Sequence, residues 1–195
     1  MKTKFMLSLG SIIPVVFFAT TIICGFIMGG YNHFTRMVSE LGAIGTPSQY
    51  VFSTGLISCS ALSVLFVIGL FRTCKEAGLS VIPAIIILSY SISIAGAGIF
   101  PLPLRLHLIM GLPSTILFLS PLMSLFLWSR EKDLPNIITM SAVGLFIMSL
   151  GFLAFMPELL SNYLGLKQRL FHIGWSVWFI YLSYAFRNLL NNYKV

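Results

Sequence analysis

The run L-S-L-G-S-I-I-P-V-V-F-F-A-T-T-I-I-C-G-F-I-M-G, residues 7–29, contains no charged side chain. About 20 consecutive apolar residues in an α-helix cross the hydrocarbon core of a bilayer. The run is longer than the hydrophobic part of a typical secretory signal peptide, and no A-x-A-like cleavage site follows it. It therefore predicts a first membrane-spanning helix that is retained in the mature protein.

Further runs of this kind follow along the chain, and none alternates apolar with polar residues as a strand of a membrane β-barrel would. The sequence therefore predicts an all-α fold, a polytopic membrane bundle of six transmembrane helices in a single domain over residues 1–195. The predicted helices cover residues 7–29, 50–71, 81–100, 107–128, 137–156 and 170–189.

The composition excludes a water-soluble domain. Hydrophobic residues make up 57% of the chain and charged residues only 9%, whereas soluble domains carry about 25% charged residues. A compact soluble core could not bury this much apolar surface. The net charge of +7 does not indicate a nucleic-acid partner, because the basic residues are scattered singly between apolar segments and form no stripe.

The basic residues divide unequally between the two sides of the predicted bundle. The side with both termini and the second and fourth connections holds eight of them, and the other side holds four. Since loops rich in Lys and Arg stay in the cytoplasm, both termini are predicted to be cytoplasmic, in a multi-pass protein of the plasma (inner) membrane. The eight are Lys2, Lys4, Arg72, Lys75, Arg130, Lys132, Arg187 and Lys194, and the four are Arg36, Arg105, Lys167 and Arg169.

The predicted outer side also collects ionisable groups at or just inside the helix ends. Such groups are costly to desolvate, so they are expected to face the bundle or a wet cavity and to find partners there. The alternative is structural, because charges at helix ends also snorkel to the interface without further function. The members are His33, Arg36, Glu40, Arg105, His107, Glu158, Arg169 and His172.

The stretch T-R-M-V-S-E-L-G-A-I-G, residues 35–45, belongs to this outer side and has a local explanation. With Thr35 as N-cap and Gly42 just after the last turn, it predicts a short interfacial helix. On such a helix Arg36 and Glu40 are spaced i,i+4 and can form an ion pair.

A functional explanation of the same stretch makes it the rim of a polar cavity at the outer ends of the third, fourth and sixth helices. Glu40 would then pair with Arg105 or Arg169, and the two arginines would suit a phosphate. In an enzyme His107 would be the general base, and Glu40 its orienter or acid, beside Ser39. His172 and Glu158 complete the predicted ligand-binding set.

Two other kinds of site use the same residues. A zinc site would take three imidazole nitrogens and one carboxylate, although no H-E-x-x-H or H-x-x-x-H motif occurs. A serine–histidine–carboxylate arrangement is chemically sensible, although the chain lacks a G-x-S-x-G elbow. The zinc set is His33, His107, His172 and Glu40, and the nucleophilic set is Ser39, His107 and either Glu40 or Glu158. No C-x-x-C occurs, so neither a structural disulfide nor a cysteine metal site is predicted.

The chain resembles domain-of-unknown-function family 998, a group of bacterial and archaeal multi-helix membrane proteins. The resemblance rests on five features: Y-N at 31–32, S-E-L-G-A at 39–43, G-I-F-P at 98–101, the histidine at 107, and G-L-K-Q-R-L at 165–170 followed by Trp175. It implies six helices and adds Asn32 to the site residues. The matched positions are Asn32, Ser39, Glu40, Gly42, Pro101, His107 and Arg169, whereas His33 and Gln168 depart from the expected pattern.

These features together predict an extracytoplasmic polar cavity that recognises or modifies a lipid headgroup or similar amphiphile. Membrane lipids are the expected partners, with a small amphiphilic ligand in the cavity, and the motifs point to no particular cofactor. A non-catalytic assembly or accessory protein is the alternative. A small transporter is less favoured, because the helix centres offer only serines, threonines and cysteines.

Overall fold

The computed structural model describes residues 2–156 and 158–192, and in these ranges it contains helices and turns but no strand. The predicted all-α fold is therefore confirmed. The elements, with η for a 3-10 helix, are α1 (Thr3–Met28), η1 (Val38–Gly42), α2 (Gln49–Glu76), α3 (Ile82–Ile86), α4 (Leu88–Ile99), α5 (Arg105–Gly111), η2 (Leu112–Ile116), α6 (Leu119–Leu127), α7 (Ile137–Leu150), η3 (Gly151–Phe155) and α8 (Leu164–Asn192).

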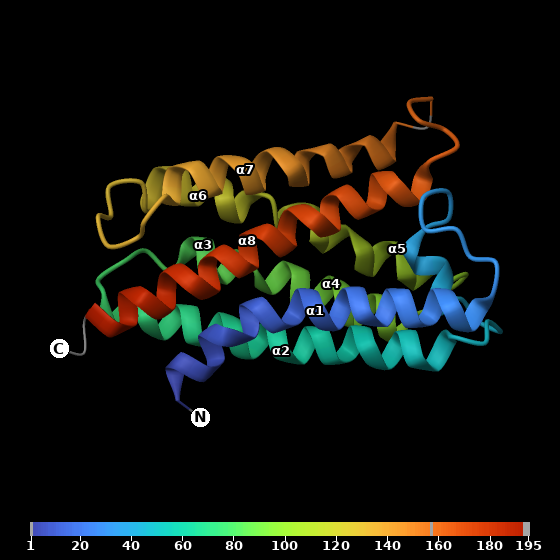
Figure 1. Ribbon diagram of the computed structural model, residues 1–195, viewed down its shortest axis with the longest axis horizontal. Coiled ribbons are helices and arrows are strands. Elements are labelled where there is room, and N and C mark those ends of the chain that lie inside the picture. The colour runs from blue at the N-terminus through green and yellow to red at the C-terminus, as the bar shows by residue number, and fades with distance from the viewer. Residues whose placement is uncertain (1, 157, 193–195) are drawn as a thin grey trace.

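The helices pack in the order of the sequence and close into a ring. Helix α1 packs against α2, and α2 against α4. Helix α4 contacts α5 and η2, α3 contacts α6, and α6 contacts α7. Helix α8 then packs between α7 and α1 (Figure 1). Helix α1 begins and α8 ends toward the left-hand end of Figure 1, whereas η1 and the start of α5 lie at the opposite end.

Five segments of the described chain are long and apolar enough to cross a membrane, which indicates an integral membrane protein. Helix α8 has 29 residues but is not among the five, so the predicted sixth span is not confirmed by length and composition. Its two ends carry polar residues, among them Lys167 and Arg169 at the start and Arg187 near the end. The five segments are Thr3–Met28, Gln49–Glu76, Ile82–Ile99, Arg105–Leu127 and Ile137–Phe155.

Three predicted continuous helices are interrupted. The range 81–100 divides into α3 and α4 at Ile87, and 137–156 ends in the 3-10 turn η3. The range 107–128 divides into α5, η2 and α6. Pro113 lies in η2, where a proline ring removes an N–H donor and crowds the carbonyl group four residues back, so the α-helix cannot continue unbroken.

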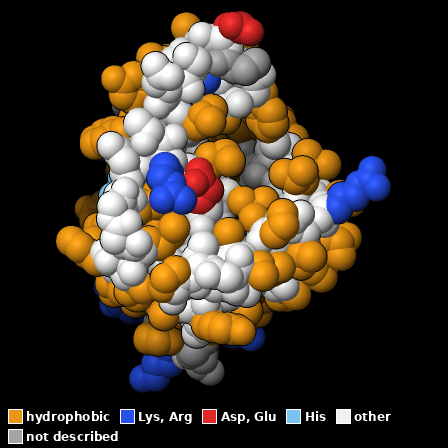
Figure 2. All heavy atoms as spheres, turned by 90° about the vertical axis from the view of Figure 1, so that its right-hand side faces the viewer, with side chains coloured by type: hydrophobic (Ala, Val, Ile, Leu, Met, Phe, Trp, Pro, Cys, Tyr) orange, Lys and Arg blue, Asp and Glu red, His pale blue; other side chains and the backbone are white. Residues whose placement is uncertain are grey.

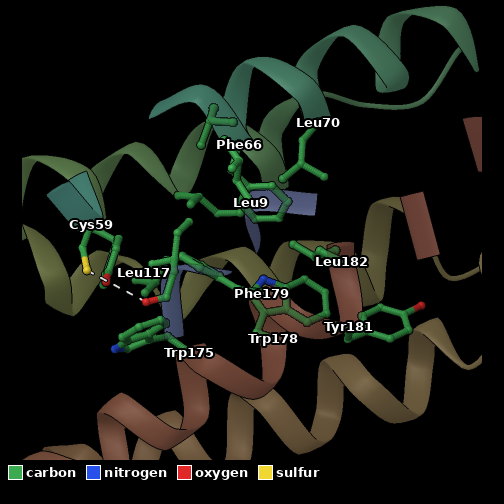
Figure 3. Packing of buried hydrophobic residues seen from close by; sticks show 14 of the residues in the cluster. Leu9, Cys59, Phe66, Leu70, Leu117, Trp175, Trp178, Phe179, Tyr181 and Leu182 are labelled. Atoms are coloured by element: carbon green, nitrogen blue, oxygen red, sulfur yellow. Dashed lines mark hydrogen bonds between the residues drawn. The ribbon is translucent and has the colours of Figure 1, made fainter. Parts of the chain in front are cut away.

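The core lies where α8 meets α1 and α2. In the sequence, Trp175 and Trp178 lie near the predicted outer end of the last helix, with Tyr163 before it, a pattern that predicts an aromatic belt at the membrane interface. Both tryptophans are fully buried, so that prediction is wrong for them. The ring centroids of Phe66 on α2 and Phe179 on α8 lie 5.6 Å apart (Figure 3). A Cβ atom at Gly10 of α1 would overlap both the Phe66 ring and the Phe179 carbonyl oxygen, so a residue without a side chain lets three helices meet there.

The connection between α1 and α2 contains the predicted short helix, although in a different form. Element η1 begins after an N-cap at Met37, not at Thr35, and it is a 3-10 helix. Gly42 is its last residue and does not have a positive φ, so the expected role after the helix end is wrong. A Cβ atom at Gly42 would overlap the ring of Phe52, so the absence of a side chain lets η1 lie directly on α2.

Candidate functional site

Glu40 uses both carboxylate oxygens within its own turn. Its Oε2 atom pairs with Arg36 Nε at 2.8 Å, and its Oε1 atom accepts the backbone N–H of Met37 at 2.7 Å. The expected ion pair between Glu40 and Arg105 or Arg169 is therefore wrong, and the local i,i+4 pair forms instead. The carboxylate caps the first turn of η1 and holds Arg36 beside it.

Arg169 fastens the loop before η1 to the first turn of α8. Its Nη1 atom donates to the carbonyl oxygens of Arg36 at 3.2 Å and Gly165 at 3.1 Å. Its Nη2 atom donates to the Tyr31 hydroxyl at 3.2 Å and to His33 Nδ1 at 2.8 Å. A phosphate ligand would have to displace these contacts. We call these residues the clamp: Tyr31, His33, Arg36, Glu40 and Arg169.

His33 completes the clamp as a neutral imidazole. Because a guanidinium group only donates, His33 Nδ1 must present its lone pair to Arg169. Burial, followed by the positive charge of Arg169, lowers the pKa of His33 below its usual value. Its ring meets that of Tyr31 edge-on at 4.9 Å. His33 therefore has a structural role in the clamp.

A pocket of about 460 Å³ lies beside the clamp at the same end of the bundle. Its walls come from α1, η1, α2, α4, α5, η2, η3 and α8, with Phe17, Phe52, Phe152 and Phe171 among the apolar side chains. Figure 2 looks onto this end and shows hydrophobic side chains around a hollow, with a basic and an acidic side chain in contact beside it. The volume lies within the range of about 300–1,000 Å³ that is usual for small-ligand sites.

One wall of the pocket carries polar groups from η1 and α8. Ser39, on η1, is half-buried and lines the pocket. Gln168 and His172 are spaced i,i+4 on α8 and both line it, so they share one helix face. Gln168 Oε1 accepts the backbone N–H of Val38 at 2.7 Å, which joins η1 to α8 and leaves the amide NH₂ group to donate.

His107 lines the pocket from the first turns of α5. Its Nδ1 atom lies 2.8 Å from the carbonyl oxygen of Phe100, an acceptor, so Nδ1 carries the hydrogen and Nε2 of the neutral ring can accept one. The expected orienting contact from Glu40 is wrong, because the Phe100 carbonyl takes that place. Within the described residues, no hydrogen bond links Ser39 to His107 or His107 to a carboxylate, so neither nucleophilic set is assembled.

His172 presents a buried nitrogen without a partner. Because the Trp175 indole N–H donates to His172 Nδ1 at 3.0 Å, the neutral ring carries its hydrogen on Nε2. Nε2 is buried and has no hydrogen-bond partner among the described residues. Tyr90 also lines the pocket, and its hydroxyl group is likewise buried without a hydrogen-bond partner among the described residues. The centroid of its ring lies 4.6 Å from that of Trp175. Buried polar groups without partners are uncommon in proteins.

The remaining predicted site residues do not line the pocket. Asn32 accepts the backbone N–H groups of Phe34 at 2.9 Å and Thr35 at 3.3 Å, which closes a turn. Arg105 and Glu158 are exposed. No group of three metal-ligating side chains occurs within the described ranges, so the zinc set of three histidines and Glu40 is not assembled.

Sequence reasoning missed Tyr90. It recorded Tyr31 only as part of a family motif, and Gln168 only as a departure from the family pattern. Tyr31 precedes Asn32 directly in the polar loop, and Gln168 precedes Arg169, so adjacency to a predicted site residue was the available signal. Tyr90 gave no such signal, because it lies inside an apolar run. Its place beside the pocket depends on the packing of α4 against Trp175 of α8, which is a contact between distant parts of the sequence.

A family model described as "Protein of unknown function (DUF998)" matches residues 11–185, which is most of the chain. No curated protein and no solved structure matches the chain.

Proposed function

The chain belongs to the DUF998 family, and we propose that it binds a membrane-borne amphiphile in the pocket at the clamp end of its helical bundle. In this proposal α8 is the sixth span, both termini are cytoplasmic in the inner membrane, and the pocket faces the extracytoplasmic side. The basic-residue asymmetry of the sequence supports this orientation. The observation that carries the binding proposal is the pocket itself, in which a few polar groups, among them Gln168, His172 and His107, lie among mostly apolar side chains.

The position of the pocket favours a ligand that arrives from the lipid. Leu108, Leu112 and Phe155 all line it, and each is more than half exposed. The first two belong to α5 and η2, and the third belongs to η3, so apolar side chains flank the pocket from two segments. In a membrane such side chains face the acyl chains of lipids. An acyl chain can therefore pass between them into the pocket and remain in an apolar environment.

The polar groups favour binding over catalysis. Arg169 and Glu40 are used in the clamp, and the described residues show no relay from His107 to a carboxylate. His107 Nε2 remains an acceptor on the pocket wall, so it would be the base if the protein modifies its ligand. In the clamp, the charged side chains already bond to one another and to other groups of this chain. This observation favours the second candidate, a non-catalytic accessory protein in which these residues serve only to pack the fold.

The test is to fill the pocket without disturbing the clamp. Gly111 lines the pocket, and a Cβ atom there would meet no atom within 4 Å, so Gly111→Leu can add a side chain without a clash at its first atom. Ile109→Phe is the matched control, because Ile109 is exposed on the same helix and does not line the pocket. Native mass spectrometry of protein extracted in polymer nanodiscs should detect a bound lipid in the unmodified protein and in the control.

Loss of that bound lipid in Gly111→Leu alone would support the proposal. If no lipid stays bound to any of the three proteins, or if all three retain it equally, the pocket is not the binding site and the accessory-protein reading becomes the better one. A change in the mass of an added lipid during incubation, lost on replacing His107, would add catalysis to binding.

A further inference from the structure

The pocket has no formal charge in its wall. Among its lining residues, all of them in the described part of the chain, there is no Lys, Arg, Asp or Glu. The charged groups of the same end are used elsewhere. Arg169 holds the loop, Arg36 and Glu40 pair with one another, and the buried Lys167 donates to the Met156 carbonyl oxygen at 2.7 Å. Arg105 and Glu158 are exposed outside the pocket. A phosphate or carboxylate buried in this pocket would lose its hydration without gaining a cation, which is strongly unfavourable.

The pocket does offer hydrogen-bond donors. The hydrogen of His172 is on Nε2, because Nδ1 accepts from Trp175. This buried Nε2–H group has no hydrogen-bond partner in the part of the chain that the structure describes. The Gln168 amide NH₂ group lies one helical turn away on the same face of α8. A rise of 1.5 Å per residue separates these two positions by about 6 Å along the helix axis. The two donors therefore fit an uncharged ligand that has two acceptor oxygen atoms about 6 Å apart.

We propose that the pocket binds the uncharged acyl ester of a neutral lipid of the monoacylglycerol type, whose carbonyl oxygen accepts the hydrogen of His172 Nε2. This inference rests on the proposed function and narrows its ligand class. The glycerol hydroxyl groups then meet Gln168 and Ser39, and the acyl chain leaves between Leu108 and Phe155 toward the bilayer. The carbonyl oxygen supplies the partner that the buried nitrogen lacks, which removes the cost of an unsatisfied donor.

This assignment departs from the sequence-based expectation that Arg105 and Arg169 would hold a phosphate. The departure has a physical cause. The guanidinium group of Arg169 points toward the loop before η1. Its two Nη atoms make four contacts with other groups of this chain, so the side chain does not line the pocket. The pocket therefore favours a ligand that accepts hydrogen bonds and carries no charge.

The test compares three probes that share one oleoyl chain and differ in the head: 1-oleoylglycerol, oleate, and 1-oleoyl-lysophosphatidic acid. Binding of each is measured by native mass spectrometry with the full-length protein after its own lipids have been exchanged for detergent. We expect 1-oleoylglycerol to bind at least about tenfold more tightly than either anion, the factor that one lost hydrogen bond and a desolvated charge supply at minimum. Tighter binding of the phosphate probe would overturn the inference.

The pocket-filling variant Gly111→Leu separates the two proposals. If the phosphate probe binds best and Gly111→Leu abolishes that binding, the pocket is a lipid site but its ligand is charged, so the inference fails and the proposed function stands. If no probe binds, or if Gly111→Leu binds all three probes as the unmodified protein does, both fail.

A spectroscopic readout tests the hydrogen bond itself. 1-Oleoylglycerol labelled with ¹³C at the carbonyl carbon should show its ester band at lower frequency when bound to the unmodified protein than when bound to His172→Phe. The phenyl ring keeps the tilted contact with Phe17, whose centroid lies 4.5 Å from that of His172. It removes both imidazole nitrogens, of which Nδ1 accepts from Trp175 and Nε2 is the proposed donor. Ile109→Phe, which adds a phenyl ring outside both the pocket and the clamp, is the control, and its bound ester band should match that of the unmodified protein. An unshifted band in the unmodified protein would contradict the assigned contact.

Discussion

Arg169 Nη2 donates to His33 Nδ1 at 2.8 Å, across 136 residues of sequence, and this contact joins α8 to the loop that carries η1. A guanidinium group cannot accept a hydrogen bond, so His33 Nδ1 must be the acceptor. The hydrogen bond therefore exists only while His33 is neutral. The loop in turn supplies Ser39 and Val38 to the pocket wall. The protonation state of one histidine is thus coupled to the shape of the candidate binding site.

The first prediction concerns stability and pH. Because burial and Arg169 lower the pKa of His33, the unfolded chain binds a proton more readily than the folded one. The contribution of this contact is therefore fully present above the unfolded pKa of about 6.5 and is lost as the pH falls below that value. Thermal unfolding of the detergent-solubilised protein should show the midpoint falling from about pH 6.5 downward.

His33→Asn provides the control for that prediction, because an amide oxygen can accept from Arg169 without titrating. The variant should lose part of the acid-dependent decline. The other charged or titratable groups near His33 are Tyr31, Arg36, Arg169 and Glu40. An identical pH profile for the variant and the unmodified protein would assign the decline to one of these groups instead of His33.

The second prediction uses two glycines with opposite surroundings. A Cβ atom at Gly165 would overlap the carbonyl oxygens of Arg36 and His33, which are backbone atoms and cannot turn aside. Gly165→Ala should therefore destabilise the protein by about 1–3 kcal/mol. Gly111→Ala, in a helix and with no atom near the added carbon, should instead stabilise it by about 0.5–1 kcal/mol. Unfolding in a denaturing detergent titration measures both, and destabilisation of similar size at the two positions would contradict the clamp geometry.

The third prediction concerns Glu40, which sequence reasoning placed in a catalytic set. Its pair with Arg36 is partly solvated, with side-chain exposures of 40% for Arg36 and 30% for Glu40. Glu40→Gln should cost less than about 1 kcal/mol of stability, because exposed ion pairs contribute little. Lipid binding should be unchanged, since Glu40 does not line the pocket. A variant that folds normally but loses bound lipid would return Glu40 to the binding site.

The sequence predicted the positions of the helical segments, because each apolar run must form internally hydrogen-bonded structure in lipid. It did not predict the interruptions at Ile87 or η3, since apolar composition is the same on both sides of each. It also assigned Trp175 and Trp178 to the membrane interface, although both are fully buried. Hydropathy does not distinguish a side chain that faces lipid from one that faces another helix.

The candidate site was predicted in part for a related reason. Polar residues at helix ends were correctly gathered at one end of the bundle, and Arg36–Glu40 is a local pair that spacing alone predicts. The division into a clamp and a pocket depends on how the loop before η1 folds back onto α8. That arrangement follows from contacts over more than 100 residues, such as Val38 with Gln168, which no local pattern encodes.

The last prediction concerns orientation, and the structure determines where labels can be placed. The native cysteines Cys24, Cys59 and Cys74 are all buried, so the unmodified protein should not react with a membrane-impermeant maleimide and serves as the blank. Ser161 is exposed in the loop between η3 and α8. On the other side, the exposed Glu76 is the last residue of α2, and the exposed Lys132 lies in the connection between α6 and α7. Ser161→Cys should react in intact cells, and Glu76→Cys and Lys132→Cys only after permeabilisation, because the basic connections stay in the cytoplasm. The reverse pattern would place the clamp and the pocket on the cytoplasmic side. Labelling of Ser161→Cys and Lys132→Cys from the same side would show that the segments between them do not cross the membrane an odd number of times, which would contradict the proposed six-span arrangement.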